Sequence, residues 1–275
     1  GSLVNPDVIL TAAHCIDADF FGFDGIIKIE AFVNYTKNKG ILEELTGFEH
    51  YRSATSFIKH RDYDSNRIVN DIGLVFLDSP VYAVTPINLN ENGDMPSVGD
   101  PLTVFGHGRI SNAAISQFPQ YLMEVSIPVV SFQDCNDQNS YAGYIVDQSM
   151  ICVGASSGGK GTCNGDSGGP LIIRGSSATQ DLQVGIVSFG SSRGCSIVNY
   201  PSVFTRVSTF RQWVRDYICQ YSKVKPASCS NVAQPTPAPI KRRTRPPTPE
   251  PTEAPIAADS PSFGQSPSLG SPSFS

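Results

Sequence analysis

The strongest chemical signal in the sequence is a serine inside a glycine-rich segment, Gly165-Asp166-Ser167-Gly168-Gly169-Pro170. A serine hydroxyl is a weak nucleophile unless a base removes its proton and hydrogen-bond donors stabilise the oxyanion that forms. Glycine allows backbone conformations that direct several N–H groups into one small space. The segment therefore suits a catalytic serine, although an ordinary glycine-rich hairpin loop would have a similar composition.

Two further segments each contain one residue that could assist such a serine. His14 lies in Thr11-Ala12-Ala13-His14-Cys15, just after an apolar strand, and Asp71 lies in Asn70-Asp71-Ile72-Gly73-Leu74, just before another. Taken singly, each has a more ordinary interpretation. A lone histidine is usually structural, and an aspartate before a strand usually caps a turn.

Together the three segments are far more specific than any one of them. They resemble the histidine, aspartate and serine segments of the chymotrypsin (trypsin-like) family of serine proteases. They also occur in that family's chain order, His14, Asp71 and then Ser167. The resemblance runs from Gly1 to about Cys219 and implies a secreted serine endopeptidase that works through an acyl-enzyme.

The resemblance also assigns a role to each residue. Ser167 would attack the scissile carbonyl, His14 would transfer the proton, and Asp71 would orient His14 and stabilise its cation. The backbone N–H groups of Gly165 and Ser167 would form the oxyanion hole. Ser188 matches the family serine that donates a hydrogen bond to the triad aspartate.

A substrate pocket is implied by the same resemblance, with these expected residues: Gly161, Asn164, Ser188, Phe189, Gly190 and Ser202. Gly161 stands at the pocket base, where trypsin-like members carry an aspartate that pairs with Lys or Arg. Burying an unpaired cation is costly, so we expect an apolar residue such as Phe, Tyr, Leu or Met before the cleaved bond. Ser202 could narrow the pocket, which makes an elastase-like preference for medium apolar side chains the alternative. Phe189 replaces the usual Trp.

The chain contains seven cysteines, which suggests an oxidising compartment and leaves at least one thiol without a partner in the chain. The resemblance implies two disulfides, Cys135–Cys152 and Cys163–Cys195. Two cysteines outside the family pattern, Cys219 and Cys229, could form a third. Cys15 matches a family cysteine whose partner would lie just upstream of Gly1. We therefore expect that the sequence is truncated at its N-terminus.

In the family, removal of a propeptide frees an apolar N-terminus, which forms an ion pair with the aspartate before the nucleophile. That aspartate is Asp166 here. We expect the segment that supplies the new N-terminus to lie upstream of Gly1. The protein would then be made as a zymogen, and these 275 residues alone would be weakly active or unstable.

Most of the chain has the pattern of a β protein, with short apolar runs between Gly, Pro, Asn and Asp residues. The expected strands are Val8–Leu10, Ile26–Val33, Gly73–Leu77, Leu102–Phe105, Tyr121–Val130, Pro170–Ile173, Val184–Ser188 and Ser202–Val207. One helix is expected over Phe210–Cys219. The resemblance implies two six-stranded Greek-key β-barrels and a C-terminal helix, with the first barrel incomplete.

Composition divides the chain near residue 230. Segment 231–275 contains 11 of the 21 prolines, many serines and two aromatic residues. Such a segment cannot bury enough apolar area to offset the entropy of ordering it, so we predict a disordered Pro/Ser-rich tail. Residues 1–230 would form the peptidase domain. The basic cluster 241–245 in the tail is best interpreted as a solvated charge run.

Charge and composition limit the remaining partners. The net charge is −5, which gives no sign of a nucleic-acid partner, and no apolar run is long enough to cross a membrane. We expect no metal and no cofactor. The expected partners are protein or peptide substrates and protein inhibitors, and the expected state is a monomer.

Asn34-Tyr35-Thr36 is a glycosylation sequon compatible with secretion. The alternative from another class is a non-catalytic homologue that binds or regulates, but such homologues typically replace the serine.

Overall fold

A computed structural model describes residues 1–18, 28–37, 50–113, 117–155 and 157–231. The chain separates into two units, residues 1–235 and 236–275. The tail that the composition predicts to be disordered lies outside the described residues from position 232 onward. The first unit contains the elements described below.

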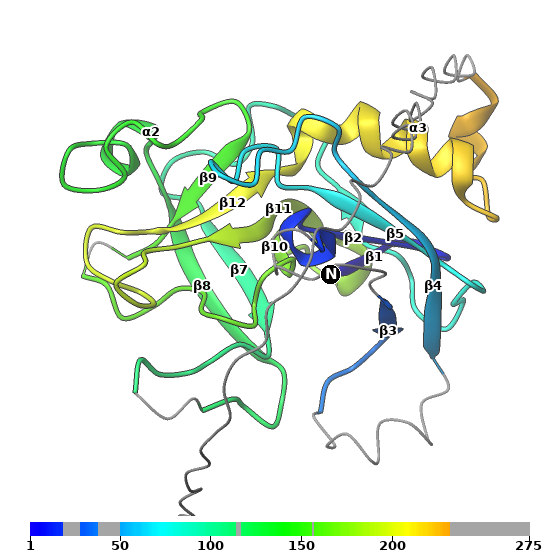
Figure 1. Cartoon of the computed structure of the whole chain (residues 1–275), viewed down its shortest axis with the longest axis horizontal. Helices are drawn as coiled ribbons and strands as arrows, with labels where there is room; N and C mark the ends of the chain where they lie inside the picture. Colours follow the sequence, from blue (N-terminus) through cyan, green and yellow to red (C-terminus); the bar gives the residue numbers. More distant parts are fainter. Residues whose placement is uncertain (19–27, 38–49, 114–116, 156, 232–275) are drawn as a thin grey trace, which may run out of the picture. The chain divides into compact units, whose positions relative to one another are not determined.

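The first sheet of this unit has five antiparallel strands in the order β1-β2-β5-β4-β3 (Figure 1). The strands are β1 (Ser2–Asn5), β2 (Val8–Thr11), β3 (Glu30–Phe32), β4 (Tyr51–Lys59) and β5 (Gly73–Leu77). Every residue of β5 is buried, which explains its nearly continuous apolar sequence. No pairing between β1 and β3 closes this sheet within the described residues.

The second sheet closes into a six-stranded barrel because β10 pairs with both β7 and β11. Its strands are β7 (Pro101–Gly106), β8 (Met123–Val130), β9 (Met150–Val153), β10 (Pro170–Ile173), β11 (Leu182–Phe189) and β12 (Ser202–Arg206), and β6 (Asn88–Leu89) adds to β11. One closed barrel and a second sheet that does not close within the described residues confirm the expected two-barrel fold with an incomplete first barrel.

Short helices connect and cover the strands. The α-helices are α2 (Phe132–Cys135) and α3 (Arg211–Tyr221), and the 3₁₀ turns are η1 (His14–Ile16), η3 (Ala178–Gln180), η4 (Val207–Phe210) and η5 (Ala227–Asn231). The predicted C-terminal helix therefore corresponds to α3. None of the helices in the described part of the chain is long and apolar enough to cross a membrane.

The helix α3 joins the two sheets through its apolar face. Val214 and Ile218 lie four residues apart, one helical turn, and both are buried. They pack in one cluster with residues of the first sheet, such as Leu10 and Leu74, and with Ile186 of β11. A separate cluster around Leu102, Leu171 and Phe204 fills the closed barrel. The shared cluster holds the segments that follow β2 and precede β5 against the barrel.

Asp7 fastens the end of α3 to the first sheet. Its carboxylate is 1% exposed and accepts hydrogen bonds from Ser222 Oγ at 2.6 Å and from the Lys223 backbone N–H at 2.6 Å. Replacing Asp7 by alanine would remove this acceptor from the buried Ser222 hydroxyl and from the partly buried Lys223 N–H.

We predict that Asp7→Ala lowers the free energy of unfolding by about 3 kcal/mol, because each hydrogen bond to a charged group contributes about 1.5–3 kcal/mol. Urea unfolding followed by tryptophan fluorescence measures the change. The control is Asp94→Ala, since Asp94 is exposed, and its loss should be within about 0.5 kcal/mol. Equal midpoints for the two variants would contradict the prediction.

Candidate active site

Strand pairing brings His14 and Asp71 together. The register of β2 and β5 places Thr11 opposite Gly73. His14 follows Thr11 by one short turn, and Asp71 directly precedes this end of β5. Both side chains therefore lie at the same end of the strand pair, and both are buried, with exposed fractions of 7% for His14 and 1% for Asp71.

Asp71 holds His14 through two hydrogen bonds. Oδ1 accepts from the His14 backbone N–H at 2.9 Å, and Oδ2 lies 2.8 Å from the ring atom Nδ1. Ser188 Oγ donates to the same Oδ2 at 2.5 Å, and Thr205 Oγ1 donates to the Asp71 carbonyl at 2.7 Å. A carboxylate bonded to Nδ1 places the other ring nitrogen, Nε2, where it can exchange a proton with a neighbouring group.

The surroundings of His14 shift its pKa in opposing directions. Burial disfavours the imidazolium, but hydrogen bonds with Asp71 and with the thiol of Cys15, together with their charges, raise the pKa of His14 from 6.5 to about 10. The Cys15 sulfur lies 3.5 Å from Nε2. Because folding favours the protonated ring, this group stabilises the fold below its unfolded pKa near 6.5 and loses that contribution as pH rises through about 10.

We predict that Cys15→Ala lowers the pKa of His14, because the variant removes the hydrogen bond and the electrostatic interaction that the Cys15 sulfur makes with the ring while leaving Asp71 in place. Titration of the His14 ring protons by NMR, with pH varied from 5 to about 11 to bracket these values, measures the shift. His60 packs against Phe210 and Trp213 and serves as the internal reference, whose pKa should not move. An unchanged His14 titration in the variant would show that Cys15 has no such effect.

The serine segment packs against the histidine segment because Gly168 lacks a side chain. A Cβ atom at Gly168 would lie 2.2 Å from Oγ1 of Thr11 and 3.2 Å from the Cys15 sulfur, and its φ of +75° also favours glycine. The Gly168 N–H donates to the Val187 carbonyl at 2.8 Å, which fixes the turn to β11. Ser167 itself is exposed at the tip of this turn.

The backbone N–H groups of Gly165 and Ser167 are available as hydrogen-bond donors beside the serine hydroxyl. Gly165 has a φ of +99°, a conformation that residues with a Cβ rarely adopt. Within the described part of the chain, neither the Gly165 nor the Ser167 backbone N–H donates a hydrogen bond to another protein group. Two such donors close to an exposed hydroxyl could stabilise an oxyanion.

His14 and Ser167 line one cavity of about 540 Å³. Five of the six expected substrate residues line it as well: Asn164, Ser188, Phe189, Gly190 and Ser202. Among its lining residues, all from the described part of the chain, none is acidic. Phe189 meets Tyr141 and Tyr144 edge to face, with ring centroids 5.8 and 5.7 Å away. These contacts hold the Phe189 ring in place, so that it forms an aromatic part of the cavity lining.

The sixth expected residue, Gly161, lies beside the end of this cavity and lines the neighbouring one. A Cβ atom built on Gly161 would lie 3.0 Å from Oγ of Ser202 and 3.0 Å from Oγ of Ser196. The Ser202 hydroxyl accepts hydrogen bonds from the Thr162 N–H at 3.1 Å and from Thr162 Oγ1 at 2.9 Å. The buried part of the lining that Thr162 and Ser202 form is therefore polar and uncharged.

Several residues that line the cavity were not predicted from the sequence: Ile68, Thr162, Val187, Ser196 and Tyr200. Thr162 follows Gly161 directly, so its place could have been inferred from that spacing. Ser196 adopts a φ of +56°, in a loop whose conformation has no sequence pattern. The disulfide Cys163–Cys195, with sulfurs 1.96 Å apart, ties this loop to the serine segment.

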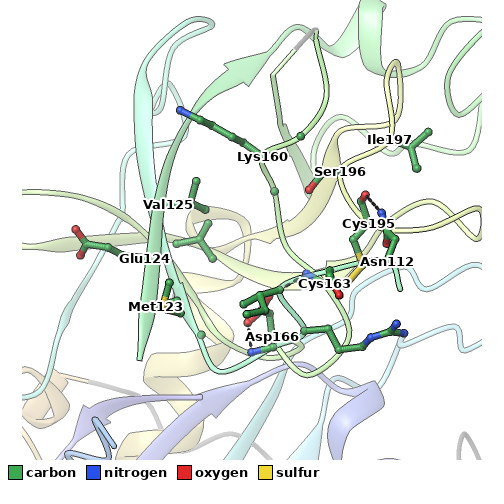
Figure 2. A pocket seen from close by; sticks show the side chains of 18 residues that line it. Asn112, Met123, Glu124, Val125, Lys160, Cys163, Asp166, Cys195, Ser196 and Ile197 are labelled. Carbon is green, nitrogen blue, oxygen red and sulfur yellow. Dashed lines mark hydrogen bonds between the residues drawn. A yellow bond between two sulfur atoms is a disulfide. The ribbon is translucent and has the colours of Figure 1, made fainter. Parts of the chain in front are cut away.

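Asp166 lies in the neighbouring cavity of about 380 Å³, which Figure 2 shows from close by. Its carboxylate accepts hydrogen bonds from the backbone N–H groups of Gly108 at 2.8 Å and of Cys163 at 2.9 Å. Burial raises the pKa of Asp166, although these two hydrogen bonds oppose the shift. Lys160 points away from Asp166 in Figure 2, and no ion pair to Asp166 is found among the described residues.

The other cysteines form two disulfides and leave one free thiol. The structure contains the disulfides Cys135–Cys152 and Cys219–Cys229, and Cys15 is a half-buried free thiol. In the described part of the chain, no group of three His, Cys, Asp or Glu side chains is arranged to hold a metal ion.

The closed barrel, the second β-sheet and the cavity that His14 and Ser167 share fit the serine-protease class. The family model described as "Trypsin" matches residues 1–214. Over 220 residues, the chain is 37% identical to brachyurin of Leptuca pugilator, covering 78% of this chain and 85% of that protein. It is 36% identical over 221 residues to serine protease 1 of Rattus norvegicus, covering 79% of each chain.

A further relative is trypsin Blo t 3 of Blomia tropicalis, with 34% identity over 220 residues, 78% of this chain and 75% of that protein. The chain thus belongs to the trypsin family of serine proteases. It is a serine-type endopeptidase whose substrates are proteins or peptides.

Proposed function

We propose that Ser167, His14 and Asp71 form the catalytic triad of this endopeptidase. In the neutral form of the ring, His14 Nε2 takes the proton of Ser167 Oγ as that oxygen attacks the scissile carbonyl, and then delivers the proton to the leaving amine. The acyl group stays on Ser167 until water, deprotonated by His14, attacks it and releases the acid. Asp71 keeps Nδ1 protonated and stabilises the imidazolium.

The observation that carries this proposal is the continuous hydrogen-bonded series Ser188–Asp71–His14, which ends in the cavity that Ser167 also lines. The negative charge of the tetrahedral intermediate would be stabilised by the backbone N–H groups of Gly165 and Ser167, which have no other partner among the described residues. The segment from Ser188 to Gly190 would pair with the substrate backbone as an added strand.

We further propose a preference for an apolar or aromatic residue before the cleaved bond. The lining of the cavity offers no carboxylate to a Lys or Arg side chain, while Phe189 and Val187 offer apolar contacts. A buried cation without a partner is costly, so basic residues should bind poorly. The buried, hydrogen-bonded pair of Thr162 and Ser202 in the cavity lining favours the alternative, an elastase-like preference for medium apolar side chains before the cleaved bond.

A panel of peptides that differ only in the residue before the cleaved bond tests this preference. We predict that the mature protein cleaves Phe or Leu peptides with kcat/KM at least 10-fold above Arg peptides. Gly161→Asp should reverse the order, because its carboxylate would stand beside Ser202. Faster cleavage of Val or Ala than of Phe would select the elastase-like alternative. A wild-type preference for Arg would refute the apolar preference.

Asp166 supports a proposal about activation. Its buried carboxylate would pair with the new N-terminus that propeptide cleavage frees, and the cavity of Figure 2 would receive that N-terminus. We also propose that the protein is secreted, with three disulfides suited to an oxidising compartment, and that it acts as a monomer open to protein inhibitors.

A further inference from the structure

Asn34 stands out from the surface beside two anchored neighbours. Val33 is buried in a cluster with Leu3 and Val75, and the Tyr35 ring lies 5.2 Å from that of His107. Asn34 itself is exposed and lies in the turn that follows β3. Because both neighbours are anchored to the protein, the Asn34 side chain remains on the solvent side.

The backbone of this turn suits asparagine in particular. Asn34 has a φ of +64°, in the left-handed region that asparagine tolerates better than most residues with a side chain. On the other side of the sequon, the Thr36 carbonyl accepts a hydrogen bond from the Leu122 N–H at 2.9 Å, while the Thr36 side chain is exposed. Within the described residues, neither the Asn34 amide nor the Thr36 hydroxyl forms a hydrogen bond.

Asn34-Tyr35-Thr36 is also the only Asn-X-Ser/Thr sequence in the 275 residues whose middle residue is not proline. A glycan is bulky and must project into solvent, and Asn34, with an exposed Thr36 two residues later, meets that requirement. The anchored neighbours carry the packing, so a modification of the exposed Asn34 side chain would leave that packing in place.

We propose that Asn34 carries an N-linked glycan. This inference rests on the proposed secretion, which brings the chain to a lipid-linked oligosaccharide donor and its transferase. The amide nitrogen of Asn34 would displace the lipid diphosphate from C1 of the first sugar. One C–N bond forms, one C–O bond breaks, and the amide loses one proton to a base of the transferase.

The test uses the protein secreted from a eukaryotic cell line and digested with peptide N-glycosidase F in heavy-oxygen water. We expect a loss of mass on digestion and conversion of residue 34 alone to a heavy-oxygen aspartate, mapped by tandem mass spectrometry. Asn34→Asp, which also tolerates the left-handed conformation, and Thr36→Ala should both abolish the mass loss. The matched control Thr36→Ser keeps the sequon and should retain it.

The same secreted sample is treated with a serine-reactive phosphonate, which separates this inference from the proposed catalytic function. Phosphonate labelling without a glycan at residue 34 would overturn the glycosylation and leave the catalytic proposal standing. A glycan at residue 34 without labelling would support the glycosylation and contradict the catalytic proposal. A mass loss that persists in both Asn34→Asp and Thr36→Ala would also overturn the assignment.

Discussion

Replacing Ser167 by alanine is expected to lower kcat by about 10⁶-fold, because removal of the nucleophile in such triads disables the whole unit. The fold should be unaffected, since Ser167 is exposed and its side chain is absent from the buried hydrogen bonds. The measurement is kcat of the mature protein on a peptide with Phe before the cleaved bond, with the melting temperature recorded on the same preparation.

The matched control is Ser177→Ala, because Ser177 is an exposed serine that precedes the 3₁₀ turn η3 and lines neither the cavity of Ser167 nor that of Asp166. Its kcat should equal that of the wild type. A Ser167→Ala protein that keeps more than about one-hundredth of the wild-type kcat would show that another group is the nucleophile.

The second large effect is expected from Asp71→Asn, with kcat reduced by about 10⁴-fold. The amide has almost the same shape, but its NH₂ group would donate to Nδ1 of His14 and so place the proton on Nε2. His14 could then no longer take the proton of Ser167. The kcat of this variant, measured on the same peptide, tests the orientation role separately from the nucleophile.

Folding is a concern for this variant, because Asp71 is buried and accepts from both His14 and Ser188. Its melting temperature is therefore compared with that of Asp62→Asn, an exposed aspartate whose change should leave kcat unaltered. If folded Asp71→Asn has a kcat within 10-fold of wild type, Asp71 does not orient His14 in the reaction.

The predicted strands agree best with the structure where both faces are buried. β5 has the predicted bounds Gly73–Leu77, and β10 has the predicted bounds Pro170–Ile173, because apolar residues fill both. β4 was missed, since its nine residues are half-buried or exposed and include Arg, Ser and Thr. The short strand β9 was missed as well, although its four residues are apolar and all buried; it pairs with both β8 and β12.

The site residues were likewise predicted best where the local sequence is distinctive. The order and local setting of His14, Asp71 and Ser167 pointed to the triad because each lies directly beside a strand or turn whose sequence is distinctive. The lining of the pocket was harder to predict, because it includes residues from the segment 191–200. Ser196 and Asn199 in this segment adopt positive φ values that the sequence does not reveal. The contact of Cys15 with His14 Nε2 also arises only from the folded turn. Ile26–Ile27, in the predicted strand Ile26–Val33, lie outside the described residues.

The most direct test of the central claim, that Ser167 is the activated nucleophile, is covalent labelling of the mature protein with a serine-reactive phosphonate, read by intact mass and by peptide mapping. We expect one label per molecule on Ser167, with no label on Ser167→Ala and greatly slowed labelling of Asp71→Asn. A folded, fully processed protein that takes up no label, or takes it up on another residue, would contradict it.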